Sequence, residues 1–204
     1  MVTKNIISQP IWAVTEYNGI LTSVLRNNFE NDNGRNGIEH ERDDEFNAYI
    51  WMSNNRELVA TIENARASEV FYESFENNGT QGQSKTGAKY LSSGSYNISN
   101  PPSGSNLKMS YWYWSGGKWN YSSELDFSPT INSSGSRLDE IRVYPEYGRM
   151  TTYTYESGIG ISSITDPNGV TQYFSYDAAN RLSKVSDNDR NLLQHTEYKY
   201  QTQN

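Results

Sequence analysis

Residues 153–200 repeat one pattern, and this repeat constrains the fold more than any other feature of the chain. Aromatic and apolar residues alternate on either side of a D-P-N-G turn at 166–169, as expected of a β-hairpin. Such a unit cannot bury its apolar face alone and must stack on its neighbours. One inserted residue then changes the spacing, so that Tyr176 recurs as Tyr198. The pairs at a spacing of 21 positions are Tyr155 and Tyr176, Ile161 and Leu182, Ile164 and Val185, Asp166 and Asp187, and Asn168 and Asp189.

The second unit begins with Tyr176-Asp177, continues with Asn180-Arg181-Leu182 and closes with a Tyr-x-Tyr motif. This pattern resembles the YD (Rhs-type) repeat of large bacterial cell-surface and secreted proteins. Asn180 stands where that repeat has glycine, Glu156 replaces its first aspartate, and Arg190-Asn191 replaces a second turn glycine. The resemblance covers about residues 149–200. It implies a β-shell or solenoid of many units, sometimes around a toxin, so we expect this chain to be part of a larger repeat protein.

Composition excludes some partners and places the chain in a broad class. The net charge is −7 and no cluster of Lys or Arg is present, which argues against binding to nucleic acid. No apolar run is long enough to insert into a membrane as a helix. The absence of cysteine is compatible with export. We therefore expect a cell-surface or secreted protein, with any signal sequence upstream of Met1.

The first 67 residues are predicted to form a β-hairpin lead-in segment. Tyr17-Asn18-Gly19 is a hairpin turn signal between two apolar runs. The charged run at 39–45 favours a solvated loop or the start of a helix. Tyr49-Ile50-Trp51 and the short apolar run at 57–62 are each predicted to be strands, and resemble the lead-in that precedes YD repeats in surface proteins.

Residues 68–146 are predicted to form a compact β-sandwich, followed by about two YD units over 147–204. Short apolar segments separated by Gly, Ser, Asn and Pro at spacings of about ten residues are typical of a sandwich. The motifs Ser74-Phe75-Glu76, T-G-x-x-Y at 86–90 and L-D-E-I-R-V at 138–143 resemble the jelly-roll carbohydrate-binding modules. The predicted fold is therefore all-β, with a jelly-roll-like sandwich before the repeat hairpins.

An aromatic segment at 107–114 is the best candidate for ligand binding. Strand alternation places Leu107, Met109, Tyr111 and Tyr113 on the core face. Lys108, Ser110, Trp112 and Trp114 then share the other face, and Trp119 and Tyr121 of the next strand could extend it. Sugar rings stack on aromatic surfaces, so these four aromatic residues form a candidate glycan platform. The alternative is that they pack against the lead-in segment or the repeat.

Glu76 and Asp139 form a second candidate site. In jelly-roll modules of the kind resembled, the acid after the first strand and the aspartate of the closing strand often share a structural calcium ion. Calcium prefers carboxylate and carbonyl oxygens, about six to eight of them. The alternative is two surface acids at strand ends, with no cofactor required. The acidic runs at 166–169 and 187–191 fit β-turns better than metal loops.

Catalysis is not expected from this sequence. With no cysteine, and with His40 and His195 as the only histidines, thiol chemistry is excluded and a Ser-His-Asp triad has few places to form. Two function classes remain open. One is a glycan-binding module displayed beside YD repeats, with a polysaccharide as its partner. The other is a structural or interaction segment, in which the sandwich caps or packs against the repeat shell of a larger, sometimes toxin-delivering, protein.

Overall fold

The computed structural model describes residues 11–17, 20–29, 36–42, 45–52 and 57–199. All strand pairings in this part of the chain are antiparallel. The helical structure in it is one short 3₁₀ turn, η1 (Ala67–Glu69). The predicted all-β fold is confirmed.

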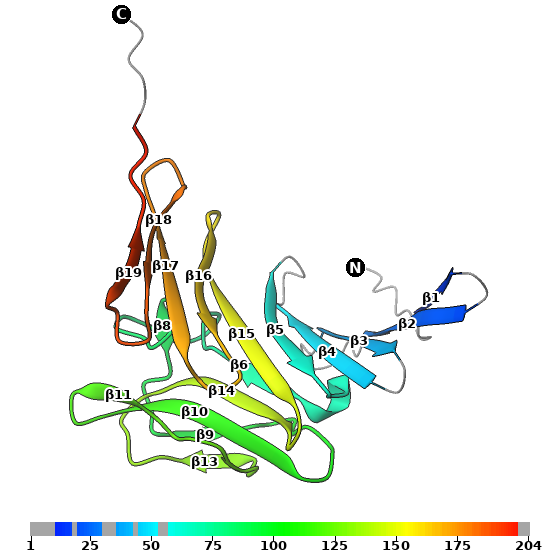
Figure 1. Ribbon diagram of the computed structural model, residues 1–204. Coiled ribbons are helices and arrows are strands. Elements are labelled where there is room, and N and C mark those ends of the chain that lie inside the picture. Colours follow the sequence, from blue (N-terminus) through cyan, green and yellow to red (C-terminus); the bar gives the residue numbers. More distant parts are fainter. Residues whose placement is uncertain (1–10, 18–19, 30–35, 43–44, 53–56, 200–204) are drawn as a thin grey trace, which may run out of the picture.

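One ten-stranded antiparallel sheet runs through the molecule (Figure 1). It is a simple meander except at its centre, where β5 pairs with β15 rather than with the next strand of the chain. We call it the long sheet. Its strands, in sheet order, are β1 (Ile11–Tyr17), β2 (Ile20–Phe29), β3 (Asn36–Arg42), β4 (Glu45–Trp51), β5 (Leu58–Glu63), β15 (Arg149–Glu156), β16 (Gly160–Thr165), β17 (Thr171–Tyr176), β18 (Leu182–Ser186) and β19 (Leu192–His195).

The residues between β5 and β15 form the predicted sandwich. Its larger sheet has the order β11-β10-β14-β6, with β12 also paired to β10. Two small two-stranded sheets, β9 with β13 and β7 with β8, complete the sandwich. The antiparallel sandwich is thus an insertion into the long sheet. Its strands are β6 (Phe71–Glu73), β7 (Thr80–Gln81), β8 (Lys89–Tyr90), β9 (Ser95–Asn97), β10 (Leu107–Ser115), β11 (Lys118–Tyr121), β12 (Leu125–Asp126), β13 (Thr130–Asn132) and β14 (Leu138–Pro145).

The sandwich core lies on the face of β10 that strand alternation predicts. Leu107, Met109 and Tyr111 are buried there, with Tyr113 packed at the edge. From β14, Ile141 and Val143 face the same core. Burying each large aliphatic side chain contributes about 1.5–3 kcal/mol, so this cluster is the main source of stability within the sandwich.

Strand β14 contains a β-bulge at Glu140, and its two faces are both buried, one in the sandwich core and the other against the long sheet. Glu140 has a φ of 51°, and the pairing with β10 shifts register between Ser110 and Trp112. A bulge inserts one extra residue into the strand, so two successive residues point to the same face and the alternation resumes after them. Ile141 therefore faces the sandwich core, while Asp139, Glu140 and Arg142 are buried on the opposite side, where β14 meets the long sheet.

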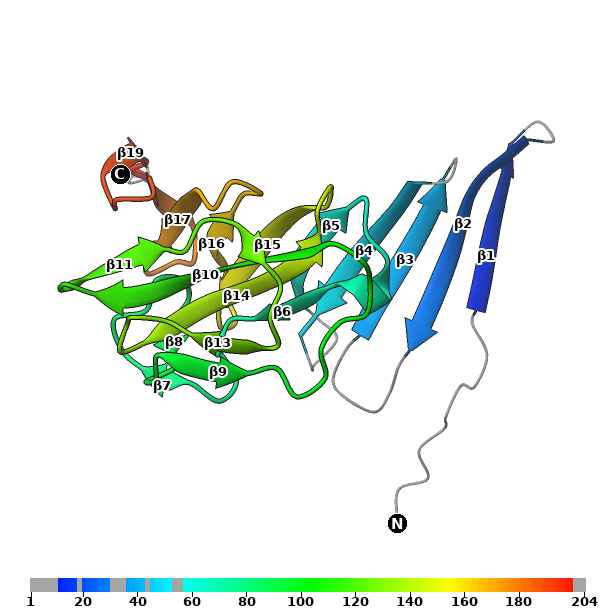
Figure 2. The ribbon, with the colours of Figure 1, turned by 90° about the horizontal axis from the view of Figure 1, so that it is seen from below.

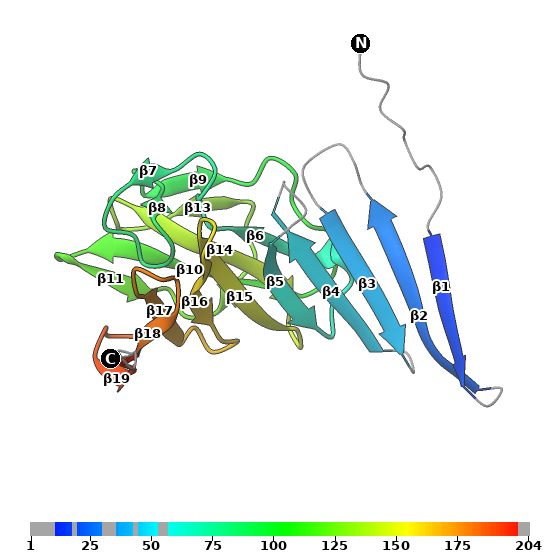
Figure 3. The same ribbon diagram turned by 90° about the horizontal axis from the view of Figure 1, so that it is seen from above.

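A second apolar cluster joins the sandwich to the long sheet. Its members come from β4, β5 and β15 on one side and from the sandwich on the other. The sandwich lies against one face of the sheet around β5, β15, β16 and β17, while β1 and β2 extend beyond it (Figures 2 and 3). The buried residues of this cluster are Ala48, Ala60, Ile62, Ala65, Val70, Tyr144 and Met150.

Two expectations for the lead-in segment differ in outcome. The predicted hairpin is present, because Tyr17 pairs with Ile20, although the turn residues Asn18 and Gly19 lie outside the described residues. The prediction of a loop or helix start at 39–45 is wrong, since Asn36–Arg42 form strand β3. Pairing with β2 on one side and β4 on the other supplies the backbone hydrogen bonds that override the charge pattern.

We expect Gly169→Ala to destabilise the protein more than Gly158→Ala does. Both glycines have positive φ, 79° and 73°, so alanine costs about 1–2 kcal/mol at each. A Cβ at Gly169 would also lie 2.5 Å from Cζ of Tyr121, whereas nothing lies within 4 Å at Gly158. Overpacking adds about 1–3 kcal/mol at Gly169. Urea unfolding of both variants tests this, and equal losses would contradict the contact between the sandwich and this turn.

Candidate functional site

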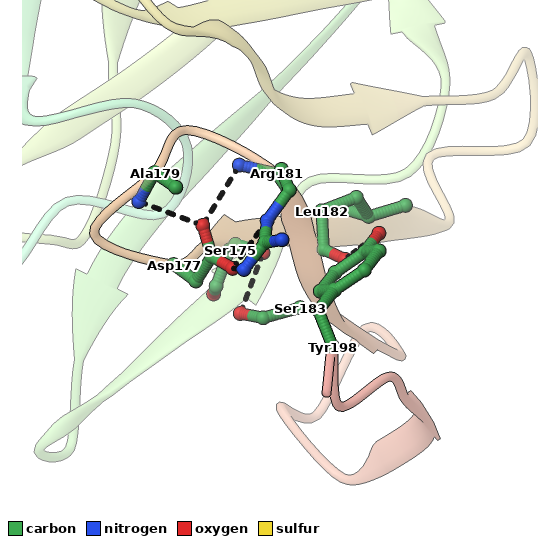
Figure 4. Close-up of polar contacts among 7 residues, drawn as sticks. All are labelled: Ser175, Asp177, Ala179, Arg181, Leu182, Ser183 and Tyr198. Carbon is green, nitrogen blue, oxygen red and sulfur yellow. Dashed lines mark hydrogen bonds and ion pairs between the residues drawn. The ribbon is translucent and has the colours of Figure 1, made fainter. Parts of the chain in front are cut away.

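The turn from Asp177 to Arg181 shows what the aspartate of the YD motif does (Figure 4). Asp177 Oδ1 accepts the backbone N–H groups of Ala179 and Arg181 at 2.8 and 3.0 Å. Its Oδ2 accepts Nε and Nη2 of Arg181 at 2.9 and 2.7 Å, and these bonds lower the pKa of Asp177. The Arg181 guanidinium lies 4.0 Å from the ring centroid of Tyr198. The aspartate therefore closes its own turn and positions the arginine against a later tyrosine.

The other two acidic turns use the same arrangement, which confirms them as turns. Asp166 Oδ1 accepts backbone N–H groups two and four residues later, and so does Asp187 Oδ1. The fourth residue has positive φ in every turn, and this explains the glycine at that position in the repeat pattern. Asn180 and Arg190, which stand in for glycine, adopt φ values of 59° and 67°.

The repeat tyrosines fix the register between successive hairpins. Each of three tyrosines at the repeat spacing donates its hydroxyl to a backbone carbonyl of an earlier hairpin. The first acceptor lies in β5, before the inserted sandwich, so the bonding pattern of the repeat crosses the insertion. The bonds run from Tyr155 to Leu58 (2.7 Å), from Tyr176 to Ile161 (2.8 Å) and from Tyr198 to Leu182 (3.1 Å).

Trp112 and Tyr121 of the predicted glycan platform lie at the junction with the repeat. Trp112 is only 6% exposed. Its ring is covered by the ammonium of Lys85 at 3.8 Å and by the Tyr121 ring at 5.1 Å. Tyr121 in turn lies over Gly169 of the repeat turn. These two aromatic side chains therefore pack in the arrangement that the alternative interpretation requires.

Trp114 and Trp119 are half-buried and contact residues of the sandwich. Their rings meet edge to face, with centroids 5.5 Å apart and an interplanar angle of 77°. Trp119 also meets Tyr90 edge to face, and the Arg137 guanidinium lies 4.6 Å from Tyr90 and 4.9 Å from Trp114. The two indoles thus form an angular cluster with a cation, not the flat platform on which a sugar face stacks best.

The carboxylates of Glu76 and Asp139 both hold the loop at 84–89. Glu76 Oε1 accepts the backbone N–H groups of Ala88 and Lys89 at 3.0 and 2.9 Å. Asp139 Oδ2 accepts those of Lys85 and Thr86 at 2.8 and 3.1 Å. Burial raises the pKa of both carboxyls, and at Asp139 the nearby Glu140 raises it further. The two acids therefore hold the same loop through backbone hydrogen bonds, an arrangement that neither the calcium prediction nor its alternative of two surface acids included.

The oxygen atoms of these two carboxylates do not offer the coordination that a calcium ion needs. The Lys89 ammonium already donates to the Glu76 carbonyl at 2.7 Å, so a cation is present at this end of the loop. Asp139 Oδ1 is buried without a hydrogen-bond partner, but a single orphan oxygen falls short of the six to eight that calcium takes. Among the described residues, no group of three or more His, Cys, Asp or Glu side chains is placed to hold a metal.

A layer of buried polar residues between β14 and the long sheet was missed by sequence reasoning. Glu140 accepts hydrogen bonds from the hydroxyls of Thr152 and Thr165, the second at 3.1 Å. Arg142 donates to the carbonyls of Met150 and Asp166, the second at 3.0 Å. Burial raises the pKa of Glu140, and the charge of Arg142 opposes that shift. Three charged residues in the closing L-D-E-I-R-V strand were the available signal.

Lys85 is the other residue that sequence reasoning missed, and it links the sandwich to the last described turn. Its ammonium donates to the backbone oxygen and the Oδ1 of Asn188 at 3.3 and 2.9 Å. Its carbonyl accepts the Tyr173 hydroxyl at 2.9 Å and Arg190 Nη2 at 3.2 Å. Burial lowers the pKa of Lys85 to about 8. A lone lysine in a polar loop gives no sequence signal for this position.

Comparison with known families identifies the repeat. Residues 161–192 match the family described as RHS repeat, within the range that the YD pattern predicts. This segment is thus similar to the RHS repeat, which typically occurs in cell-surface and secreted proteins. No curated protein matches the chain significantly. In the described residues we find no helix with the length and apolar character needed to cross a membrane.

We expect calcium to leave the stability of the protein unchanged. The melting temperature should be the same in excess EDTA and in millimolar calcium, because Lys89 already supplies the positive charge beside Glu76. Lys89→Met should lower it, by loss of that hydrogen bond. Thermal unfolding followed by circular dichroism makes the comparison, with Lys118→Met at an exposed position as the control. A rise in melting temperature on addition of calcium would restore the calcium hypothesis.

Proposed function

We propose that this chain is a non-catalytic structural module of a cell-surface or secreted repeat protein, in which the inserted sandwich braces one face of the YD-repeat sheet. The observation that carries the proposal is the insertion itself. β5 comes before the sandwich in the chain and β15 comes after it, yet the two strands pair directly, through Ala60 with Thr152 and Ile62 with Met150. The sandwich is therefore inserted between two paired strands of the long sheet and packs against that same sheet.

The junction has the properties of a permanent contact rather than an open binding face. It combines the apolar cluster around Ile62 and Met150 with the buried polar layer of Glu140 and Arg142. Buried charges that lose one partner become strongly destabilising, so such a junction tolerates few alternative arrangements. A brace at this position would fix the orientation of the repeat hairpins that follow, with the remainder of a larger repeat chain as its partner.

Trp112→Ala should loosen the repeat while Trp114→Ala should not. Truncating a buried tryptophan costs about 3–5 kcal/mol, and the side chain of Trp112 faces Lys85 and Tyr121 at the junction. Trp114 is the matched control, because it lies two residues along on the same face of β10 and contacts Trp119 and Arg137. Amide hydrogen exchange of β17 and β18 is the measurement. Unchanged protection in Trp112→Ala, or equal loss in both variants, would overturn the brace.

Glycan binding is the second candidate, and the Arg137 cluster is the observation that favours it. A guanidinium between Tyr90 and Trp114, beside a half-buried Trp119, offers hydrogen-bond donors next to aromatic edges. We expect a soluble polysaccharide that binds here to protect tryptophan fluorescence from acrylamide quenching. Trp114→Ala should abolish that protection, with Trp51→Phe as the control. An unchanged response across a panel of neutral and acidic polysaccharides would remove this candidate.

A further inference from the structure

The contact between Lys85 and Asn188 brings an amine against a side-chain amide. Nζ of Lys85 lies 2.9 Å from Oδ1 of Asn188, the oxygen bonded to the electrophilic Cγ. The sandwich loop at 84–89 supplies the amine and the repeat turn at 187–190 supplies the amide. We propose that these two side chains form an isopeptide bond, from Nζ of Lys85 to Cγ of Asn188, which joins the sandwich covalently to the repeat.

Both reacting side chains are held in place by their own loops. The loop of Lys85 is anchored by Asp139, which accepts its backbone N–H at 2.8 Å, and by the Tyr173 hydroxyl. Asn188 lies in the turn that the Asp187 carboxylate closes. Fixing two reactants in contact replaces a bimolecular step by an intramolecular one, with effective molarities of about 10⁵ M or more when the alignment is good.

The amide oxygen of Asn188 already has a second donor. The backbone N–H of Thr171 lies 3.2 Å from the same Oδ1 that Lys85 contacts. When an amine attacks Cγ, negative charge develops on Oδ1, and a fixed N–H group at this distance stabilises it. Thr171 itself is completely buried in β17, so this donor does not move with the turn.

Burial of Lys85 raises the fraction of its side chain that is present as the neutral, nucleophilic amine. The side chain is 5% exposed, and the Trp112 ring lies 3.8 Å from Nζ, with the Tyr173 ring at 5.6 Å. Burial lowers the pKa of Lys85 to about 8, assisted by Arg190 and opposed by Glu140, Asp189 and Asp139. A desolvated lysine of this kind is an activated nucleophile near neutral pH.

The reaction balances without an oxidant or a cofactor. The ammonium of Lys85 first loses a proton to solvent, and the neutral Nζ then attacks Cγ, so that the carbonyl electron pair moves onto Oδ1. Nζ then gives up a proton to solvent, and Nδ2 takes one up through the Asp189 carboxylate, whose Oδ1 lies 3.5 Å from it. The bond between Cγ and Nδ2 breaks, ammonia leaves, and a secondary amide remains.

The intact mass of the purified full chain tests this bond. We expect a mass lower than that of the sequence by one ammonia molecule, and a tryptic digest in which the peptides of Lys85 and Asn188 are joined. Lys85→Arg and Asn188→Ala should both restore the full mass, while Lys89→Arg should keep the loss. A wild-type chain at full sequence mass would overturn the proposal. So would a mass raised by deamidation, or an ammonia loss that persists in Lys85→Arg.

This inference rests on the proposed packing of the sandwich on the repeat, but the two fail separately. A chain at full mass in which Trp112→Ala still exposes β17 and β18 to exchange would retain the brace and exclude the covalent bond. A joined peptide establishes the bond whatever the exchange experiment shows. The mass measurement is made on the wild-type chain, so a variant that fails to fold does not affect it.

Discussion

The pairing of β5 with β15 is the constraint on which the rest of the structure depends. These strands are separated by the whole sandwich, yet they pair in register from Ala60 with Thr152 to Glu63 with Arg149. The hydroxyl of Tyr155 adds a bond to the carbonyl of Leu58 across the same pair. Closing so long a segment costs conformational entropy, but the cost grows only slowly with length. The folded sandwich must therefore keep its two ends close together, and the hydrogen bonds between β5 and β15 stabilise that arrangement.

The composition of the junction explains why the sandwich takes one orientation on the sheet. An apolar contact alone is non-directional and would tolerate small rotations. The hydrogen bonds of Glu140 to two threonines and of Arg142 to two backbone carbonyls have fixed geometry. The bulge at Glu140 makes this possible, because it turns two successive acids toward the sheet while Ile141 remains in the sandwich core.

The sequence was sufficient for the repeat turns and for the core face of β10, but not for the contacts between distant segments. The repeat turns followed from Asp, Pro, Asn and Gly at fixed offsets, and the core face of β10 followed from its alternation. The pairing of β5 with β15 could not be predicted, because turn signals report only which neighbouring strands pair. They say nothing about two strands separated by residues 64–148. The strand at Asn36–Arg42 was missed for a related reason, since pairing on both edges outweighs a run of charges.

The aromatic residues of β10 show where this limit affects function. Trp112 and Trp114 share a face and are two residues apart, so alternation treats them as equivalent. The edge of the junction runs between them: Lys85 and Tyr121 cover Trp112, whereas Trp114 meets Trp119 and Arg137 within the sandwich. Which tryptophan is covered depends on the positions of the loop at 84–89 and the turn at 166–169, which come from other parts of the chain. A face assignment from sequence therefore identifies candidates for a binding surface, and only the tertiary contacts decide which of them remain accessible to a ligand.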